Sequence, residues 1–507
     1  MQRPSHENTE SVAEARGSSD RAFEQRLRAR LGRLGALTRH HWAFVMALAV
    51  GAILRVAMWV ALPHPLMTFT DANVYVRAAQ QFLFRPLEGR TAGYPLFLRE
   101  LHGIDDSVDL PVISQHALVL LACVALYLVA LAVRVRPTAA AIPVLVWAVS
   151  VDWLWLEHQL LSETLGVALV VFALAAVVVP RTPRILVAVL ISVLGGALIM
   201  AAGFARPALF ASVPGIGLAV LLLLDAPFRV RVVSFVCLVA TCGGLFWGYE
   251  TVQENKTGFR GLVRSELDMG AYPGVAPHAR CTEFVAPRGT RSLCETTRPR
   301  DRPGGDYYYW DPSSPGRRLL AARPDLAPAI RLWAARAALV HVEDARKEQL
   351  NAFQRLFGLG GFIRPATDSG PGQMRLDIAD ESPAPVVIEA VGEFYGAGAT
   401  VLPHSRSPYG VLVELQPITR PPGPLLLVAG LLALAGALVG AGRARRGAVV
   451  FGVVGWLPVV FATYTGGQYY WRYVLIGVPL IALAAVAGGV ALHARARAGG
   501  ALRRGDV

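Results

Sequence analysis

The sequence predicts an all-α polytopic membrane protein with about ten transmembrane helices. Of its 507 residues, 54% are hydrophobic and only 17% are charged, so the chain is more apolar than a soluble globular protein. Long apolar runs alternate with short clusters of arginine, which do not form one continuous basic face. The formal net charge of +13 therefore favours contact with a membrane surface over contact with nucleic acid.

Ten apolar runs come close to the roughly 20 residues that a helical span requires. They lie near residues 41–62, 112–133, 138–154, 161–180, 185–203, 207–225, 231–249, 423–441, 447–464 and 471–492. A region of different composition, about 250–422, separates the seventh run from the last three. The sequence thus predicts a membrane domain with a large insertion before its last three helices.

Every second connection between the runs is rich in arginine. The basic connections precede the first run, follow the last run, and include Arg134 and Arg136, Arg181 and Arg184, Arg229 and Arg231, and Arg443, Arg445 and Arg446. Because basic loops stay on the cytoplasmic side, both termini are expected in the cytoplasm. The alternate connections, at about 63–111, 155–160, 204–206, 250–422 and 465–470, then face outward.

The chain divides accordingly into five parts. The first part is polar and arginine-rich, which indicates a partly disordered cytoplasmic tail. No small-residue cleavage site follows the first apolar run, so a removable signal peptide is not expected. A transmembrane core containing the outward loop 63–111, an extracytoplasmic region, C-terminal transmembrane helices and a second basic cytoplasmic tail follow. The five parts are residues 1–40, 41–249, 250–422, 423–493 and 494–507.

The extracytoplasmic region 250–422 is expected to be mainly α or mixed α/β. Apolar residues recur at three-to-four-residue spacing from Leu326 to Phe357, which predicts one or two amphipathic helices. Cys281 and Cys294 lie outside the apolar runs, and an oxidising compartment favours a disulfide between them over two free thiols. Such a bond contributes about 2–4 kcal/mol to local stability. No Cys or His cluster stands at zinc-ligand spacing.

Asp71 stands in the outward loop 63–111, followed by Tyr75 and later by Arg90 and Tyr94. The residues after Asp71 give a helical stripe, which predicts a short helix along the membrane interface with Thr70 or Asp71 at its N-cap. Capping alone would account for this aspartate. Its place at the edge of the bilayer also suits a general base that acts beside a lipid substrate.

Acids and arginines stand at the outer ends of three other runs. Glu157-His158 precede the fourth run and Ser162-Glu163 open it, Arg206 precedes the sixth, and Arg472-Tyr473 opens the tenth. Through the predicted topology they share one membrane face with Asp71. The pattern therefore favours a site at this face.

Each of these residues also has a simpler structural explanation. Glu163 complements the positive end of its helix, and Arg206 and Arg472 are long enough to snorkel to lipid head groups. Arg55, inside the first run, would cost roughly 2.5–3.5 kcal/mol at the bilayer centre and is expected to pair or snorkel. The neighbouring aromatic residues predict a belt at the interface, formed by Trp153, Trp155, Tyr469, Tyr470 and Trp471.

In order and sidedness, these residues resemble the GT-C superfamily, and more narrowly the phospholipid-carrier-dependent glycosyltransferases related to protein mannosyltransferases and aminoarabinose transferases. The resemblance covers about residues 40–225 and, more weakly, 423–492. Many members carry an acidic pair in the first outward loop, whereas here Asp71 is followed by Ala72 and Asn73. The matching elements are Asp71 with Tyr75, Gly93 to Leu98, Gln115, Ser162-Glu163, Arg206-Pro207 and Arg472-Tyr473.

The resemblance implies a GT-C-like fold and an inverting transfer of a hexosyl or pentosyl group from a polyprenyl-phosphate carrier to an extracytoplasmic cell-envelope acceptor. Asp71 would be the catalytic base, and Arg206 and Arg472 would stabilise the departing phosphate. Glu163 and His158 would orient substrate or those arginines. The remaining expected substrate-binding residues are Tyr75, Arg90, Tyr94 and Tyr473. A divalent cation is left open as cofactor, and the expected location is a bacterial plasma membrane.

Two other classes of function stay open. A lipid or glycan transporter, or flippase, usually carries ionisable groups near mid-membrane, and here the acids lie at one face. A non-catalytic envelope scaffold would use the region 250–422 to bind a partner, with the acids and aromatics serving only as caps and belts. The sequence has no glycine-rich phosphate loop, zinc signature or serine-hydrolase elbow to indicate a cytosolic enzyme.

Overall fold

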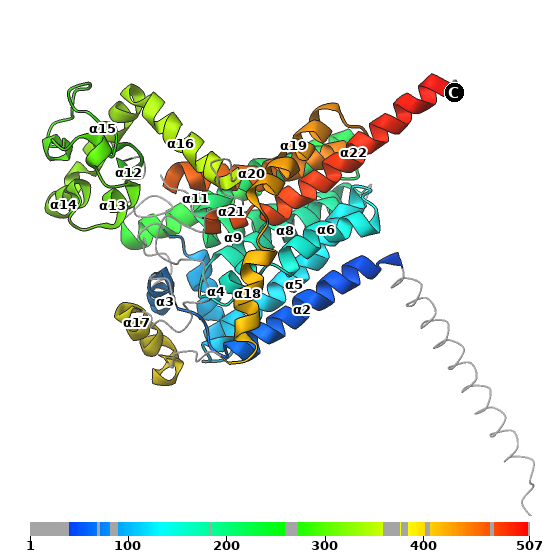
Figure 1. Cartoon of the computed structure of the whole chain (residues 1–507), viewed down its shortest axis with the longest axis horizontal. Helices are drawn as coiled ribbons and strands as arrows, with labels where there is room; N and C mark the ends of the chain where they lie inside the picture. Colours follow the sequence, from blue (N-terminus) through cyan, green and yellow to red (C-terminus); the bar gives the residue numbers. More distant parts are fainter. Residues whose placement is uncertain are drawn as a thin grey trace, which may run out of the picture.

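The computed structural model describes residues 40–67, 71–81, 90–181, 184–258, 272–357, 376, 384–400, 406–466 and 471–504 (Figure 1). Over these residues the chain is largely helical and has no strand; isolated bridges join Leu66 to Gln159 and Arg181 to Asp225. The expected all-α architecture is confirmed for this part of the chain. The N-terminal tail up to residue 39, Thr70 and the aromatic pair Tyr469-Tyr470 lie outside the described residues.

Six of the described helices are long and apolar enough to cross a membrane. They are α2 (Trp42–Ala61), α5 (Asp109–Ala132), α9 (Ile185–Ala205), α11 (Phe228–Thr257), α20 (Gly442–Gly466) and α22 (Val478–Arg504). Two bent helix pairs would raise the number to eight. The described part of the chain is therefore a multi-pass membrane protein, and the count of ten spans stays a prediction.

Each of the two bent pairs joins two apolar helices at a short break. Helix α6 (Pro137–Ala148) turns by 56° into α7 (Val151–Glu157), because Ser150 takes an extended backbone between them. Helix α18 (Tyr409–Thr419) turns by 47° into α19 (Gly423–Val439), where Pro422 cannot continue a helix. Two further apolar elements are shorter than a full span, α8 (Glu163–Val178) and the succession of η1 (Pro207–Ser212) and α10 (Val213–Leu222).

The arginine-rich connections meet at one end of the bundle. Arg443 lies 3.8 Å from Asp225 and donates to the carbonyl of Leu223, and Arg446 donates to the carbonyl of Leu222 at 3.0 Å. The bridge from Arg181 to Asp225 brings a third basic connection to the same place. Helices α8 and α9 run from this end to the opposite one, so the predicted alternation of the connections agrees with their spatial grouping. Which compartment each end faces stays a prediction.

Residues 272–340, in the region 250–422, form a separate group of helices beside the bundle (Figure 1), and they have a small core of their own. Tyr272, Tyr308, Ile330 and Trp333 are fully or almost fully buried in it. The predicted amphipathic stretch forms two helices, α15 (Ala327–Val340) and α16 (Val342–Phe357). The other described elements are α12 (Tyr272–Val275), η3 (Arg291–Leu293), η4 (Pro299–Asp301), α13 (Gly305–Trp310), α14 (Pro315–Ala322), η5 (Pro324–Leu326), α17 (Pro385–Tyr395) and η7 (Ala397–Thr400).

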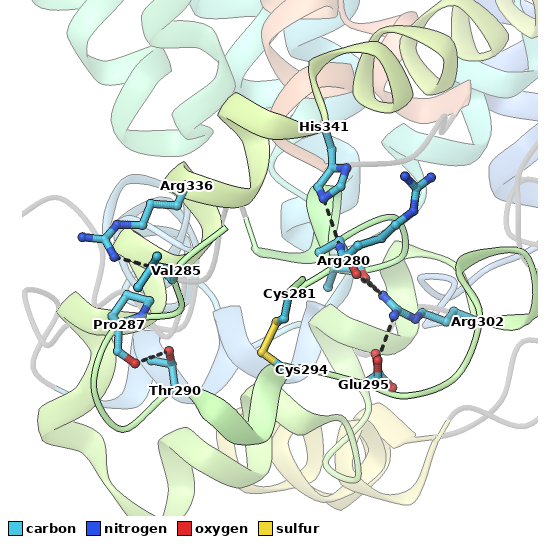
Figure 2. The surroundings of a disulfide bond; sticks show 12 residues. Arg280, Cys281, Val285, Pro287, Thr290, Cys294, Glu295, Arg302, Arg336 and His341 are labelled. Atoms are coloured by element: carbon cyan, nitrogen blue, oxygen red, sulfur yellow. Dashed lines mark hydrogen bonds between the residues drawn. A yellow bond between two sulfur atoms is a disulfide. The ribbon is translucent and has the colours of Figure 1, made fainter. Parts of the chain in front are cut away.

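A disulfide closes the loop from Cys281 to Cys294, whose Cα atoms lie 5.6 Å apart (Figure 2). Arginines fasten the chain around it, because Arg302 donates to the carbonyls of Ala276 and Ala279, and Arg336 to that of Val285. These bonds satisfy carbonyls that no regular element would satisfy. The loop is therefore held both by a covalent bond and by a guanidinium network.

Two helices of this region pack on the membrane domain. Helix α16 lies against α19 and α20, with the ring of Phe357 6.0 Å from that of Trp456. Helix α17 packs on α3 (Asp71–Gln80), where Arg77 and Glu389 form an ion pair at 2.9 Å (Figure 1). The insertion thereby supports the helix that carries Asp71.

Helix α4 (Gly93–His102) begins in close contact with the end of α9. A Cβ atom at Gly93 would stand 2.5 Å from the carbonyl carbon of Phe204, so only glycine fits there. This approach holds the segment from Arg90 to Tyr94 against the end of α9, where Arg206 follows. Two segments far apart in the sequence are thus fixed side by side.

Candidate active site

Five segments bring their polar side chains together at the end of the bundle opposite the arginine-rich connections. They are the start of α3, the segment before α4, the start of α8, the junction of α9 with η1, and α21 (Trp471–Leu475). Asp71 opens α3 and forms ion pairs with Arg90 and Arg472, the latter at 3.1 Å. Its side chain therefore binds two guanidinium groups, one 19 and the other 401 residues further along the chain.

A second carboxylate shares Arg472 with Asp71 and also pairs with Arg206. Glu163, the first residue of α8, lies 2.6 Å from Arg206 Nη1 and 3.9 Å from Arg472 Nε. Arg206 takes an extended conformation between α9 and η1, which turns its side chain out of the helical path. Arg472 consequently bridges the two acids. The five side chains Asp71, Glu163, Arg90, Arg206 and Arg472 are called the arginine cluster below.

Three tyrosines line the arginine cluster. The guanidinium groups of Arg206 and Arg472 lie 5.0 Å and 5.1 Å from the ring centre of Tyr473, and that of Arg90 lies 5.7 Å from the ring centre of Tyr75. Such cation–π contacts stabilise a cation without neutralising its charge. The ring of Tyr94 lies 4.9 Å from that of Tyr75, and its hydroxyl donates to Gln115 at 3.0 Å.

The arginine cluster carries an excess of positive charge, because three guanidinium groups face two carboxylates. Burial would raise the pKa of Asp71, but the charges of Arg90, Arg472 and Arg206 outweigh it and lower the pKa to about 2. Asp71 is therefore ionised at any physiological pH. The cluster as a whole is built to receive an anion.

Tyr309 also lies near the arginine cluster, although the sequence pattern did not indicate it. Burial raises the pKa of its hydroxyl, and the charges of Arg90 and Asp71 act on it as well. Its carbonyl accepts from Arg317 at 2.7 Å, which fixes the end of α13. The only hint in the sequence is the aromatic run from Tyr307 to Trp310, which gives no information on where the run folds.

His158 does not join the arginine cluster. It is fully buried, lies 3.2 Å from His116 and contacts the carbonyls of Leu62 and His64. His116 in turn contacts Glu157 at 2.8 Å. The expected role of His158 in orienting substrate therefore has no direct contact in support of it.

The charge of Arg55 is paired inside the bundle. Its guanidinium lies 2.6 Å from Glu157, and it donates to the carbonyls of Gly51 and Ala148. Arg55, His116, Glu157 and His158 are called the buried charge cluster below. Arg55 was expected to pair or to snorkel, and this arrangement shows the pairing.

The described tryptophans of the predicted aromatic belt lie inside the protein. Trp153, Trp155 and Trp471 are all fully buried, so they pack in the bundle and do not face the interface. Sequence reasoning could not separate these two placements, because both occur at the ends of spans. The polar partner of Trp471, Asp152, was likewise missed.

The carboxylates of the site do not form an open ligand set for a divalent cation. Asp71 and Glu163 both face guanidinium groups, and the described residues contain no group of three or more His, Cys, Asp or Glu side chains that could hold a metal ion. A cation would have to displace arginine at these oxygens.

No protein-family model and no curated protein matches the sequence. Among solved structures, the chain is similar to the oligosaccharyltransferase of Archaeoglobus fulgidus, crystallised with a disulfide-tethered acceptor peptide that contains the NVT sequon. The similarity covers 89% of this chain and 50% of that one, with a TM-score of 0.42 and 13% identity. The chain thus spans about half the length of this neighbour. A likeness of this degree leaves the function to be inferred from the residues of the site.

Proposed function

We propose that this protein is an inverting GT-C-type glycosyltransferase that moves a sugar from a polyprenyl-phosphate carrier to an acceptor outside the cytoplasm. The observation that carries the proposal is the meeting of Asp71 and Glu163 with three arginines at one end of a membrane bundle. An anionic head group bound there would keep its hydrocarbon tail in the bilayer. The acidic and basic groups needed for transfer would surround it.

The charge balance of the arginine cluster favours a phosphate-linked donor. Bidentate guanidinium groups match phosphate oxygens in shape and charge. The cluster has one positive charge more than its own acids neutralise, so a phosphodiester anion brings it to neutrality. Arg206 and Arg472 are each about a tenth exposed, which lets them meet a ligand while keeping bulk water away.

In the proposed reaction, an acceptor hydroxyl attacks the anomeric carbon and Asp71 takes its proton. The bond from that carbon to the phosphate oxygen breaks, and the phosphate leaves with the electron pair. Attack from the opposite face inverts the configuration. Arg206 and Arg472 stabilise the charge that grows on the departing phosphate, and Glu163 holds those two arginines in position.

The pairing of Asp71 affects when it can serve as a base. A carboxylate with a pKa of about 2 accepts a proton poorly while it is bound to two guanidinium groups. A donor phosphate would compete with Asp71 for Arg472, and loss of that ion pair raises the pKa of the carboxyl. Binding of the donor would in this way activate the base.

The test uses the purified full-length protein in nanodiscs with a radiolabelled polyprenyl-phosphate sugar. Asp71→Asn should lower transfer by about 100-fold or more, the usual weight of a general base, while binding of a polyprenyl phosphate is retained. Arg77→Ala, on the same helix but outside the site, is the matched control. Near-normal transfer by Asp71→Asn would remove Asp71 from the mechanism.

A lipid or glycan transporter is the second candidate, and one observation favours it. The buried charge cluster places Arg55 and Glu157 inside the bundle, as ionisable groups of transporters are placed. Vesicles containing the protein would distinguish the two functions. Movement of lipid between leaflets without sugar transfer would support the transporter, and transfer that depends on Asp71 would reject it.

A further inference from the structure

A second buried carboxylate, Asp152, lies beside the arginine cluster without belonging to it. Asp152 is the second residue of α7, and its side chain is fully buried. Its oxygens accept four hydrogen bonds, from Arg420 Nε at 2.7 Å and Nη2 at 2.8 Å, from Gln416 at 3.0 Å and from Trp471 Nε1 at 2.7 Å. A carboxylate so fully occupied is not available to a substrate.

The bond to Trp471 matters because of the residue that follows it. Arg472 is the next residue of α21 and binds both Asp71 and Glu163. Helix α21 has only five residues, too few to hold its own position by helical hydrogen bonds. Neighbouring residues on a helix point in different directions, so Trp471 can be anchored on one side while Arg472 faces the site.

We propose that Asp152 is a positioning residue, which places Arg472 in the site by holding the indole N–H of Trp471. This inference rests on the proposed function, in which Arg472 binds the carrier phosphate. Asp152 and Trp471 touch neither substrate nor reacting atoms in this account. They set the distance at which Arg472 meets the phosphate.

Further contacts make Asp152 a rigid support. Its charge is balanced by the bidentate pair with Arg420, which comes from the junction of α18 and α19. The amide N–H of Val151 donates to Thr419 at 3.0 Å, so α7 and the end of α18 are joined twice. Gln416 also accepts from the backbone N–H of Leu376 at 3.0 Å, which ties part of the extracytoplasmic region to the same point. Removing one partner of such a buried pair leaves an uncompensated charge, so the pair holds α7 to the junction of α18 and α19.

The contacts of Asp152 also connect Arg472 to helix α18. Helix α18 lies in the region 250–422 and forms a bent pair with α19. It carries Gln416, which donates to Asp152, and Thr419, which accepts from the neighbouring Val151. A displacement of α18 would therefore be passed to Trp471 and from there to Arg472. Asp152 links the exported part of the chain to the phosphate-binding arginine.

The test compares Trp471→Phe with Trp153→Phe in the full-length protein in nanodiscs. Trp153 is equally buried, but its indole N–H has no hydrogen-bond partner among the described residues, so its loss removes bulk only. Loss of a hydrogen bond to a charged group corresponds to about a tenfold change or more. We expect the Kd for a polyprenyl phosphate to rise about tenfold in Trp471→Phe and less than about threefold in Trp153→Phe.

A second readout separates positioning from general loss of structure. Phenylglyoxal modifies arginines, and the modified residues are mapped by mass spectrometry. Trp471→Phe should speed the modification of Arg472 severalfold without speeding that of Arg55, which is paired elsewhere in the bundle. A parallel rise at both arginines would mean that the bundle has loosened, and would overturn the inference.

A double variant keeps the inference testable if single changes misfold. Asp152→Asn combined with Arg420→Gln removes both charges together and leaves neither buried alone. It should also increase the reactivity of Arg472, because Trp471 loses its charged acceptor. Unchanged reactivity in both this variant and Trp471→Phe would overturn the inference. Absence of polyprenyl-phosphate binding by the wild type would instead contradict the proposed function, and the modification experiment would still report on the placement of Arg472.

Discussion

The arginine cluster and the buried charge cluster use similar residues for different ends. Asp71, Arg90 and Arg472 retain side-chain exposures of 16%, 12% and 10%, whereas Arg55 and Glu157 retain 4% and 0%. The first cluster has three cations and two anions. The second pairs one cation with one anion and adds two histidines. What distinguishes a site from an internal support is therefore the excess charge and the access to it.

This comparison predicts that a Glu→Gln substitution mainly lowers stability in the buried charge cluster and mainly lowers transfer in the arginine cluster. Glu157→Gln leaves the buried guanidinium of Arg55 without its anion, which costs about 3–5 kcal/mol. We expect a large fall in the melting temperature, with transfer per folded molecule within about threefold of wild type. The measurement is thermal unfolding in detergent, together with the fraction of folded protein in the activity assay.

Glu163→Gln is the counterpart in the arginine cluster. Arg206 and Arg472 keep their contacts with Tyr473, and Arg472 keeps Asp71, so we expect a smaller loss of stability than in Glu157→Gln. Transfer should fall about tenfold or more, because Arg206 is no longer held at 2.6 Å from a carboxylate. Binding of inorganic or lipid phosphate should not weaken, since the net charge of the cluster becomes more positive. If both glutamate variants lost stability equally and neither lost activity selectively, the distinction between the clusters would be wrong.

The lowered pKa of Asp71 predicts how the ion pairs of the arginine cluster make stability depend on pH. Its pKa is lowered from 3.8 to about 2 in the folded protein, so the carboxylate contributes stability above its ordinary pKa and loses it as pH falls through about 2. A shift of this size corresponds to about 2 kcal/mol. The stability difference between wild type and Asp71→Asn should thus be constant above pH 4 and shrink between about pH 4 and pH 2. A difference that grows on acidification would contradict the ion pairing of Asp71.

The sequence indicated more of the arginine cluster than of its surroundings. Glu163, Arg206 and Arg472 stood out because each is a charged residue at the end of an apolar run, where charge is costly unless it is used or exposed. Asp71 stood out because it lies in the first outward loop, a few residues beyond the first run. The topology rule then assigned them to one face, and the structure brings them together at one end of the bundle. Order along the chain and charge placement were sufficient for this part.

The rest depended on contacts that no local pattern encodes. Asp152 meets Arg420 and Trp471 across intervals of 268 and 319 residues, and a lone aspartate in an apolar segment does not identify such partners. His158 was assigned to the site because it neighbours Glu163 in sequence, but the end of α7 directs it to His116 instead. The burial of Trp153 and Trp155 was missed for a related reason: an indole suits both the interface and a helix junction.

Gly93 offers a test of how closely the segments of the arginine cluster must approach. In Gly93→Ala, the added methyl group would meet the backbone of Phe204, which cannot yield as a flexible side chain could. Overpacking of this kind costs about 1–3 kcal/mol and would displace Arg90 from Asp71. We expect reduced transfer and a modest fall in melting temperature. Gly274→Ala, where a Cβ atom meets nothing within 4 Å, is the control and should change neither.

The smallest effect is expected at the exposed ion pair between Arg77 and Glu389. These side chains are 36% and 60% exposed, so water and salt screen the pair although its atoms lie 2.9 Å apart. Arg77→Ala should change stability by less than about 1 kcal/mol and leave transfer within about twofold. Asp71 lies on the same helix as Arg77 and pairs with Arg90, whose side chain is only 12% exposed. Arg90→Ala removes this pair and should reduce transfer far more. Comparable losses in the two variants would show that contact between α3 and α17 governs activity, and that the excess charge of the arginine cluster does not.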